Sequence, residues 1–231
     1  MNRTKALKLL EELERQPVRD ETTTDRAWWQ TVFPEAPDDV LDYMLKLDDL
    51  QKAGEASPWN RRTRRRLERS KGVVLHLFAG KDWKVWESMD LDGHEMLSVD
   101  LLQGSRHSLH DVGTWSYLWS LASQGRVKAV IGGPPCRTTS RMRHSQPGPA
   151  PLRGRSADRY GLDGLSLDDL QKTHSDSALL LKQAGLWWRA WECGLDDGFP
   201  PGFLLESPRD PMEYLDTVSE ALPAAVFSEL A

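Results

Sequence analysis

The segment VKAVIGGPPCRTTS, residues 127–140, says more about the architecture of this chain than any other. A short apolar run rich in β-branched residues stops at two glycines and two prolines, which is typical of a buried strand that ends in a rigid turn. The turn presents one thiol, Cys136. Because ligands of open α/β sheets bind at the carboxyl ends of the strands, we expect Cys136 at the mouth of a sheet and not inside it.

A second apolar run, residues 72–78, predicts a strand of a parallel sheet that is covered on both faces. The glycine turn at Gly80 leads into a predicted helix that ends near Met89, and residues 94–99 form a further strand that ends at Asp100. This is the beginning of a βαβ unit, with an acid twenty positions after the glycine turn. The pattern suggests a nucleoside cofactor whose ribose hydroxyls meet Asp100.

The dinucleotide pattern Gly-x-Gly-x-x-Gly is absent, because Lys81, Asp82 and Trp83 follow Gly80. A cofactor without phosphates therefore fits this turn better than a nicotinamide or flavin dinucleotide.

The remaining elements of this domain follow in order. Residues 113–124 predict a helix, residues 166–191 predict a long helix capped by Ser166, and residues 202–208 predict a last strand that ends near Glu206. Between Cys136 and the long helix lies an irregular segment that carries six arginines: Arg137, Arg141, Arg143, Arg153, Arg155 and Arg159. A basic loop beside a nucleophile, in a protein of net charge −5, fits a phosphate backbone. A disordered insertion is the alternative.

Residues 1–71 differ in pattern from the rest of the chain and predict a helical N-terminal extension. Residues 4–16 and 37–52 have helical patterns with one apolar face, and a short segment between them carries Trp28 and Trp29. Residues 61–71 then contain seven positive charges against one negative. Such a block is a solvated linker, a phosphate-contacting arm or a nuclear-import signal, and it marks the boundary before an α/β domain over residues 72–231.

Composition limits the classes of protein and of site to which this chain can belong. The 231 residues suffice for one well-buried domain and an extension. There is no apolar run of about 18 residues and no signal-peptide pattern, so we expect no membrane partner and an intracellular location, nuclear if the source is eukaryotic. The two cysteines, Cys136 and Cys193, cannot build a disulfide framework, and no Cys/His cluster has the spacing of a zinc site. We therefore expect no metal.

Gly-Pro-Pro-Cys at 133–136, with Ser140 four residues on, resembles the nucleophile motif of the cytosine-5 DNA methyltransferases, Pro-Pro-Cys-Gln-x-Phe/Tyr-Ser. Arg137 stands where that family has Gln, and Thr139 where it has an aromatic residue. Leu-Phe-Ala-Gly at 77–80 resembles the opening of the family's S-adenosylmethionine motif, and His-Asp-Val at 110–112 resembles its Gly-Asp-Ile segment. Glu206 matches the glutamate of the family's Glu-Asn-Val.

The resemblance implies an α/β, Rossmann-like S-adenosylmethionine-dependent methyltransferase sheet with helices on both faces, together with the N-terminal helical extension. It implies methyl transfer to cytosine carbon-5 through a covalent adduct with Cys136, with Glu206 hydrogen-bonded to the ring. The residues implied to bind S-adenosylmethionine are Phe78, Ala79, Gly80, Asp100, Asp111 and Pro134. Those expected to contact DNA, with RNA not excluded, are Arg137, Ser140, Arg141, Arg143, Arg153 and Arg155.

The resemblance covers residues 72–208, the front half of a methyltransferase catalytic domain. We therefore expect a domain that is incomplete at its C-terminus and a second chain or a further segment that completes the site. The alternative is a catalytically inactive nucleic-acid-binding relic, or a fragment of a larger mobile-element polyprotein. A third interpretation is a Rossmann-like enzyme that uses Cys136 for other chemistry.

Overall fold

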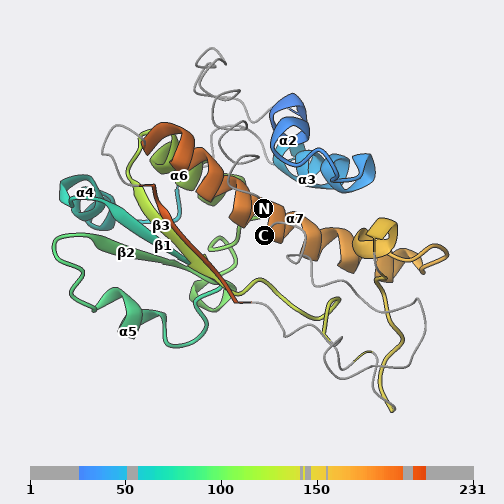
Figure 1. Ribbon diagram of the computed structural model, residues 1–231. Coiled ribbons are helices and arrows are strands. Elements are labelled where there is room, and N and C mark those ends of the chain that lie inside the picture. Colours follow the sequence, from blue (N-terminus) through green and yellow to red (C-terminus); the bar gives the residue numbers. More distant parts are fainter. Residues whose placement is uncertain are drawn as a thin grey trace.

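The computed structural model describes residues 26–50, 57–140, 143, 147–154, 156–194 and 200–206. Four strands form one sheet in the order β2-β1-β3-β4, and every neighbouring pair is parallel (Figure 1). The strands are β1 (Val73–Leu77), β2 (Glu95–Val99), β3 (Val127–Gly132) and β4 (Gly202–Leu205). The prediction of an α/β fold with a parallel sheet is confirmed, and the arrangement is compatible with a Rossmann-like fold.

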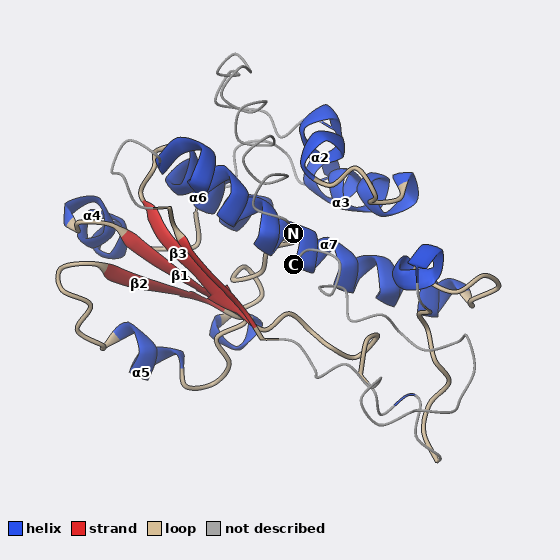
Figure 2. Cartoon of the chain, viewed as in Figure 1, coloured by secondary structure: helices blue, strands red, loops and turns tan. Residues whose placement is uncertain are grey.

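Helices lie on both faces of the sheet (Figure 2). The helices α6 (Val112–Ser123) and α7 (Leu167–Gly194) cover one face, while the short helix α5 (Trp83–Glu87) packs against β2 on the other. Short 3₁₀ turns follow β2 at Leu101–Gln103, η1, and precede α7 at Ser156–Tyr160, η3. The α5 face is only partly covered by the described residues, because Leu204 on β4 is 63% exposed.

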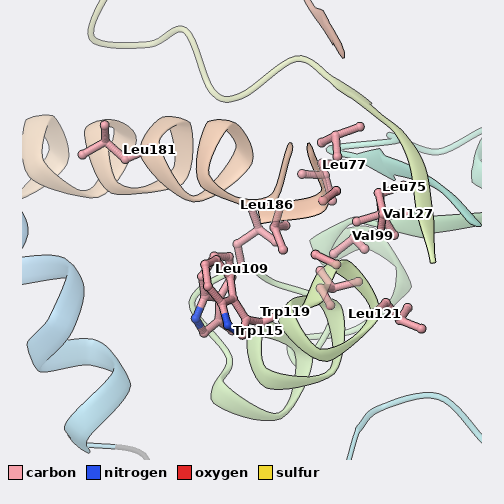
Figure 3. Close-up of a cluster of buried hydrophobic side chains, with 14 of the residues drawn as sticks. Leu75, Leu77, Val99, Leu109, Trp115, Trp119, Leu121, Val127, Leu181 and Leu186 are labelled. Carbon is pink, nitrogen blue, oxygen red and sulfur yellow. The ribbon is translucent and has the colours of Figure 1, made fainter. Parts of the chain in front are cut away.

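The main core lies between the sheet and α6 and α7 (Figure 3). Alternate residues of β1, such as Leu75 and Leu77, are fully buried there, as the period of a strand requires. Leu186 of α7 and Trp115 of α6 meet them from the helical layer. The sheet and these two helices therefore form a single packed unit.

Two N-terminal helices, α2 (Arg26–Val32) and α3 (Asp38–Leu50), pack on α7 (Figure 1). Trp29 of α2 is fully buried and stacks 6.1 Å from Trp115. Gly185 of α7 permits this contact, because a Cβ atom at that position would lie 2.5 Å from the Trp29 ring. The helix expected at 37–52 is thus α3 and the segment of Trp28 and Trp29 is α2, and both share the core of the α/β unit. The predicted helix at 4–16 lies outside the described residues, as do residues 51 and 52.

The basic block forms a helix, α4 (Arg61–Arg69), immediately before β1. Asn60 caps its first turn by accepting a hydrogen bond of 2.9 Å from the backbone N–H of Thr63. Leu67 is fully buried, and the Arg126 guanidinium donates to the carbonyl oxygens of Leu67 and Ser70 at the helix end. The block is therefore anchored at the amino ends of the strands. None of the described helices is both long enough and apolar enough to span a bilayer.

Candidate functional site

The turn that carries Cys136 begins where β3 approaches β1 most closely. A Cβ atom on Gly132 would lie 2.3 Å from the carbonyl oxygen of Leu77, so only glycine allows this approach. The chain then leaves the sheet through Gly133 and the two prolines, and Cys136 is exposed. The thiol therefore lies outside the sheet at its carboxyl end, as the sequence predicts.

Glu206 lies next to the start of this turn. It directly follows β4, and its backbone N–H donates to the carbonyl oxygen of Gly132 at 2.9 Å. A carboxylate oxygen of Glu206 lies 3.2 Å from the point where a Cβ atom of Gly133 would stand. The neighbouring ends of β3 and β4 thus bring an acid, 70 positions away in sequence, to the segment that leads to Cys136.

The ends of β1 and β2 bring Gly80 and Asp100 together. The backbone N–H of Gly80 donates to Oδ2 of Asp100 at 2.9 Å, and the N–H of Leu102 donates to Oδ1 at 2.8 Å. Phe78 and Gly80 both have positive φ, 58° and 69°, and the N–H groups of Phe78 and Ala79 donate to Val99. Apart from its chain neighbours, no atom of the described residues lies within 4 Å of the point where a Cβ atom of Gly80 would stand. This tight turn therefore leaves open space beside a carboxylate.

Asp111 caps the start of α6. Its Oδ1 accepts a hydrogen bond of 2.8 Å from the N–H of Thr114, and its Oδ2 lies 3.6 Å from Nε of Arg106. Only 12% of the side chain is exposed. Asp111 is thus an N-cap whose two oxygens both have protein partners, a role that the sequence analysis did not assign to it.

Arg153, expected to contact nucleic acid, is buried, with only 3% of the residue exposed. Its guanidinium donates to the Thr138 hydroxyl at 3.1 Å, the Ser177 hydroxyl at 2.9 Å and the Thr173 carbonyl at 2.8 Å. Burial lowers the pKa of Arg153 to about 10, although nearby Asp176 favours the charged form. The side chain fastens the loop to α7 and is not available to a nucleic acid in this structure.

Asp176 of α7 is the acid at the centre of this network. It accepts hydrogen bonds from Nε of Arg137 at 3.0 Å and from the Thr138 hydroxyl at 2.9 Å. Burial raises the pKa of Asp176, while these hydrogen bonds and the two arginines oppose the rise. The two residues that follow Cys136 are therefore held to α7 through one carboxylate.

The other arginines of the loop are also directed to the protein where they are described. Arg143 donates to the carbonyl oxygens of Arg137 and, at 2.8 Å, Ala150. Ser140 and Pro134 are half-buried. Arg141 and Arg155 lie outside the described residues. The basic segment beside Cys136 thus uses much of its donor capacity internally.

Sequence reasoning missed three polar residues that face this region. The amide nitrogen of Gln183 donates to the carbonyl oxygens of Gly132 at 3.2 Å and Leu204 at 3.4 Å, bridging β3 and β4. The ring of His110 lies 3.2 Å from the Ser175 hydroxyl, and burial, with the charges of Lys182 and Arg137, lowers its pKa to about 4. Together with Asp176, Gln183 and His110 contribute polar groups from α7 and from the segment just before α6 to the region around the Cys136 turn. Asp176 and Gln183 lie on the buried face of α7. Buried polar residues need partners, so this pattern in the sequence could have indicated that they hold the site.

The comparisons with known proteins place no further constraint on the site. No family model matches the chain, no curated protein matches it, and no solved structure matches it. Among the described residues, no group of three or more histidines, cysteines or acids is arranged to hold a metal ion.

Proposed function

We propose that this chain is a cytosine-5 DNA methyltransferase-like protein that transfers a methyl group from S-adenosylmethionine to cytosine. The observation that carries the proposal is the placement of Glu206 against Gly133, at the start of the Gly-Pro-Pro-Cys turn. A nucleophile and an acid on neighbouring strand ends suit chemistry on a planar ring. The composition of the turn and its order before Glu206 support the same assignment.

The residues at the ends of β1 and β2 fit the nucleoside part of the cofactor. Asp100 uses each carboxylate oxygen once, and each oxygen retains a lone pair for a ribose hydroxyl. The open space beside Gly80 would admit the ligand. Phe78, Ala79 and Gly80 would line this space, with Pro134 on the neighbouring strand end, whereas Asp111 would have to share oxygens that already cap α6. The bound cofactor would supply an electrophilic methyl group.

In the proposed reaction, the chain's own residues activate the cytosine ring. The thiolate of Cys136 would add to carbon-6, which makes carbon-5 nucleophilic. The carboxyl group of Glu206 would hydrogen-bond to ring nitrogen N3 and the exocyclic amine as negative charge develops on the ring. After transfer of the methyl group, a base such as water would take the carbon-5 proton while the carbon-6–sulfur bond breaks, which releases the Cys136 thiolate and restores the aromatic ring. The target base would have to leave the duplex to reach Cys136.

The covalent step can be tested with DNA that contains 5-fluorocytosine, because fluorine at carbon-5 cannot leave as a proton and traps the adduct. We expect a denaturation-resistant protein–DNA adduct from the wild type with cofactor, none from Cys136→Ser, and full adduct from the matched control Cys193→Ser. Absence of adduct from the wild type, or equal adduct from Cys136→Ser, would contradict the proposed chemistry.

The inactive nucleic-acid-binding alternative has one observation in its favour, since Asp100 and Asp111 already accept hydrogen bonds from the chain's own backbone. Calorimetry with S-adenosylmethionine separates the two functions. We expect micromolar binding by the wild type and by Asp163→Ala, an exposed acid in the loop before α7, and loss of binding in Asp100→Ala. No binding by the wild type would leave the nucleic-acid-binding relic as the better assignment.

A further inference from the structure

The strongest uncompensated positive charge in the described part of the chain lies on α4 and not on the loop beside Cys136. Arg66 is paired with Glu95 at 3.1 Å. Within the described residues, the other four arginines that share its face form no ion pair. These four residues are Arg61, Arg62, Arg65 and Arg69. We name them the α4 arginines.

The helical period places all of these side chains on one face of α4. At about 100° per residue, Arg61, the other three α4 arginines and Arg66 fall within an arc of about 140°. Leu67 lies on the opposite side and is fully buried. The five arginines line a groove of about 770 Å³ whose other walls are Ser70, Gly93 and Glu95. The anchored face thus fixes which side of the helix presents the charges.

This arrangement costs helix stability. Like charges three and four residues apart destabilise a helix by about 0.2–0.5 kcal/mol per pair, and Arg61, Arg65 and Arg69 stand in one such row. Acids are plentiful elsewhere in this chain of net charge −5, yet Glu68 is the only acid within α4. A local conflict of this kind indicates selection for something other than the stability of the helix.

We propose that the α4 arginines bind the phosphodiester backbone of a nucleic acid. Arg61 and Arg69 are about 12 Å apart along the helix axis at 1.5 Å per residue, and a duplex strand carries a phosphate about every 3.4 Å of its axis. The row therefore matches a stretch of backbone with three or four phosphates. Guanidinium groups bind phosphates by two parallel hydrogen bonds, which favours arginine over lysine.

A membrane surface is a poorer partner for this helix. Membrane-bound amphipathic helices insert an exposed apolar face between lipids, and the one apolar residue of α4, Leu67, is buried within the protein. The groove is lined by the five arginines, Ser70, Gly93 and Glu95, and no residue with an apolar side chain is among them. Nucleic acid is therefore the partner that the chemistry favours.

The surface on α4 is separate from the proposed catalytic site. The helix precedes β1 and lies beside the start of the sheet (Figure 1). Its groove reaches residues just before and at the start of β2, whereas Cys136 follows the carboxyl end of β3. A five-residue strand is about 16 Å long, so the two regions lie at opposite ends of the sheet. The inference rests on the proposed function only in its choice of nucleic acid as the partner, and it requires neither cofactor nor cytosine.

The test is fluorescence anisotropy with a labelled 20-base-pair duplex, either DNA with A·T pairs only or RNA with A·U pairs only, between 50 and 200 mM KCl. Four phosphate contacts predict that wild-type affinity falls about 150-fold over this range. Arg61→Gln/Arg65→Gln should bind about 60-fold more weakly at 0.1 M salt, with a log–log slope shallower by about 2. Arg61→Lys/Arg65→Lys should retain most of the salt dependence. The charge-matched control Lys84→Gln/Lys172→Gln, on α5 and α7, should bind as the wild type.

Equal affinity and slope for Arg61→Gln/Arg65→Gln and the wild type would overturn the proposal. Equal weakening by the Lys84/Lys172 control would also overturn it, because net charge and not the α4 face would then govern binding. Arginine-dependent binding to phosphatidylserine vesicles without binding to either duplex would identify a membrane instead. Circular dichroism of each variant excludes unfolding. A chain that binds the A·T duplex through α4 but fails the 5-fluorocytosine test would retain this inference and lose the catalytic one.

Discussion

Replacement of Arg153 by methionine tests whether the loop after Cys136 is held from within. Methionine fills similar space but has no donor. In the structure, the Arg153 guanidinium makes four hydrogen bonds to acceptors from the loop, η3 and α7. These acceptors are the Thr138 hydroxyl, the Arg159 carbonyl, the Ser177 hydroxyl and the Thr173 carbonyl. All four would lose this partner in the Arg153→Met variant.

The expected cost follows from burial and charge. Each buried acceptor left without a partner costs about 1–3 kcal/mol, although neighbouring losses do not add fully. Asp176 would also lose one of the two arginines that support its charge, since Arg153 favours the charged form of this buried acid. Removal of one partner from a buried charged group typically costs about 3–5 kcal/mol. We expect Arg153→Met to lower the free energy of unfolding by this amount.

Urea unfolding followed by tryptophan fluorescence measures the effect, which at about 2 kcal/mol per molar urea lowers the midpoint by about 2 M. The comparison variant is Arg137→Met. The Arg137 side chain donates to the buried Asp176 carboxylate but is itself 54% exposed, so water can replace part of its contribution and we expect a smaller loss than for Arg153→Met. Should Arg153→Met not fold, Arg153→Lys keeps the charge and should show an intermediate loss. A loss below 1 kcal/mol for Arg153→Met, or equal losses at Arg137 and Arg153, would show that the buried guanidinium does not hold the loop.

Two further predictions concern stability. Gly132→Ala should cost about 2–3 kcal/mol, because its Cβ atom would meet the Leu77 carbonyl oxygen at 2.3 Å. The control is Gly194→Ala, because, apart from its chain neighbours and its own helix backbone, no atom of the described residues lies within 4 Å of its Cβ position. An equal effect at both sites in urea unfolding would contradict the close approach. Folded His110 has a pKa of about 4 against 6.5 for an ordinary histidine, so the unfolded chain binds its proton first as pH falls, and stability is lost between about pH 6.5 and 4. From pH 7 to 5 the wild type should lose about 2 kcal/mol more than His110→Gln, and parallel pH profiles would argue against a neutral buried ring.

Much of the fold could be predicted because each strand is a short apolar run that ends at glycine, proline or an acid. Residues 73–77 and 127–132 formed strands as expected. Once the sheet is parallel, its carboxyl ends must meet along one edge, so the contacts of Gly80 with Asp100 and of Gly133 with Glu206 follow from chain order.

Which charged residues become buried, and what they contact, could not be predicted in the same way. An arginine is normally exposed, and burial of Arg153 depends on Thr138, Ser177 and Asp176, which reach it only after α7 has packed. The helix α4 likewise depends on a distant residue, because Arg126 binds the carbonyls at its end from 59 positions away. Local sequence carries no record of such partners.

The two basic segments of this chain therefore differ in what their charges do, although both look alike in sequence. In the loop, Arg137 and Arg153 lie against Asp176, and Arg143 binds backbone carbonyls, so their donors fix the course of the chain beyond Cys136. On α4, one buried leucine and a capped first turn hold the helix, and the four α4 arginines are left for solvent or a ligand. The loop beyond Cys136 is thus held by α7, whereas the proposed attraction of a polyanion would act at the other end of the sheet. A nucleic acid that reached both regions would have to span the length of the strands, which a duplex of 20 base pairs does easily at about 3.4 Å per pair.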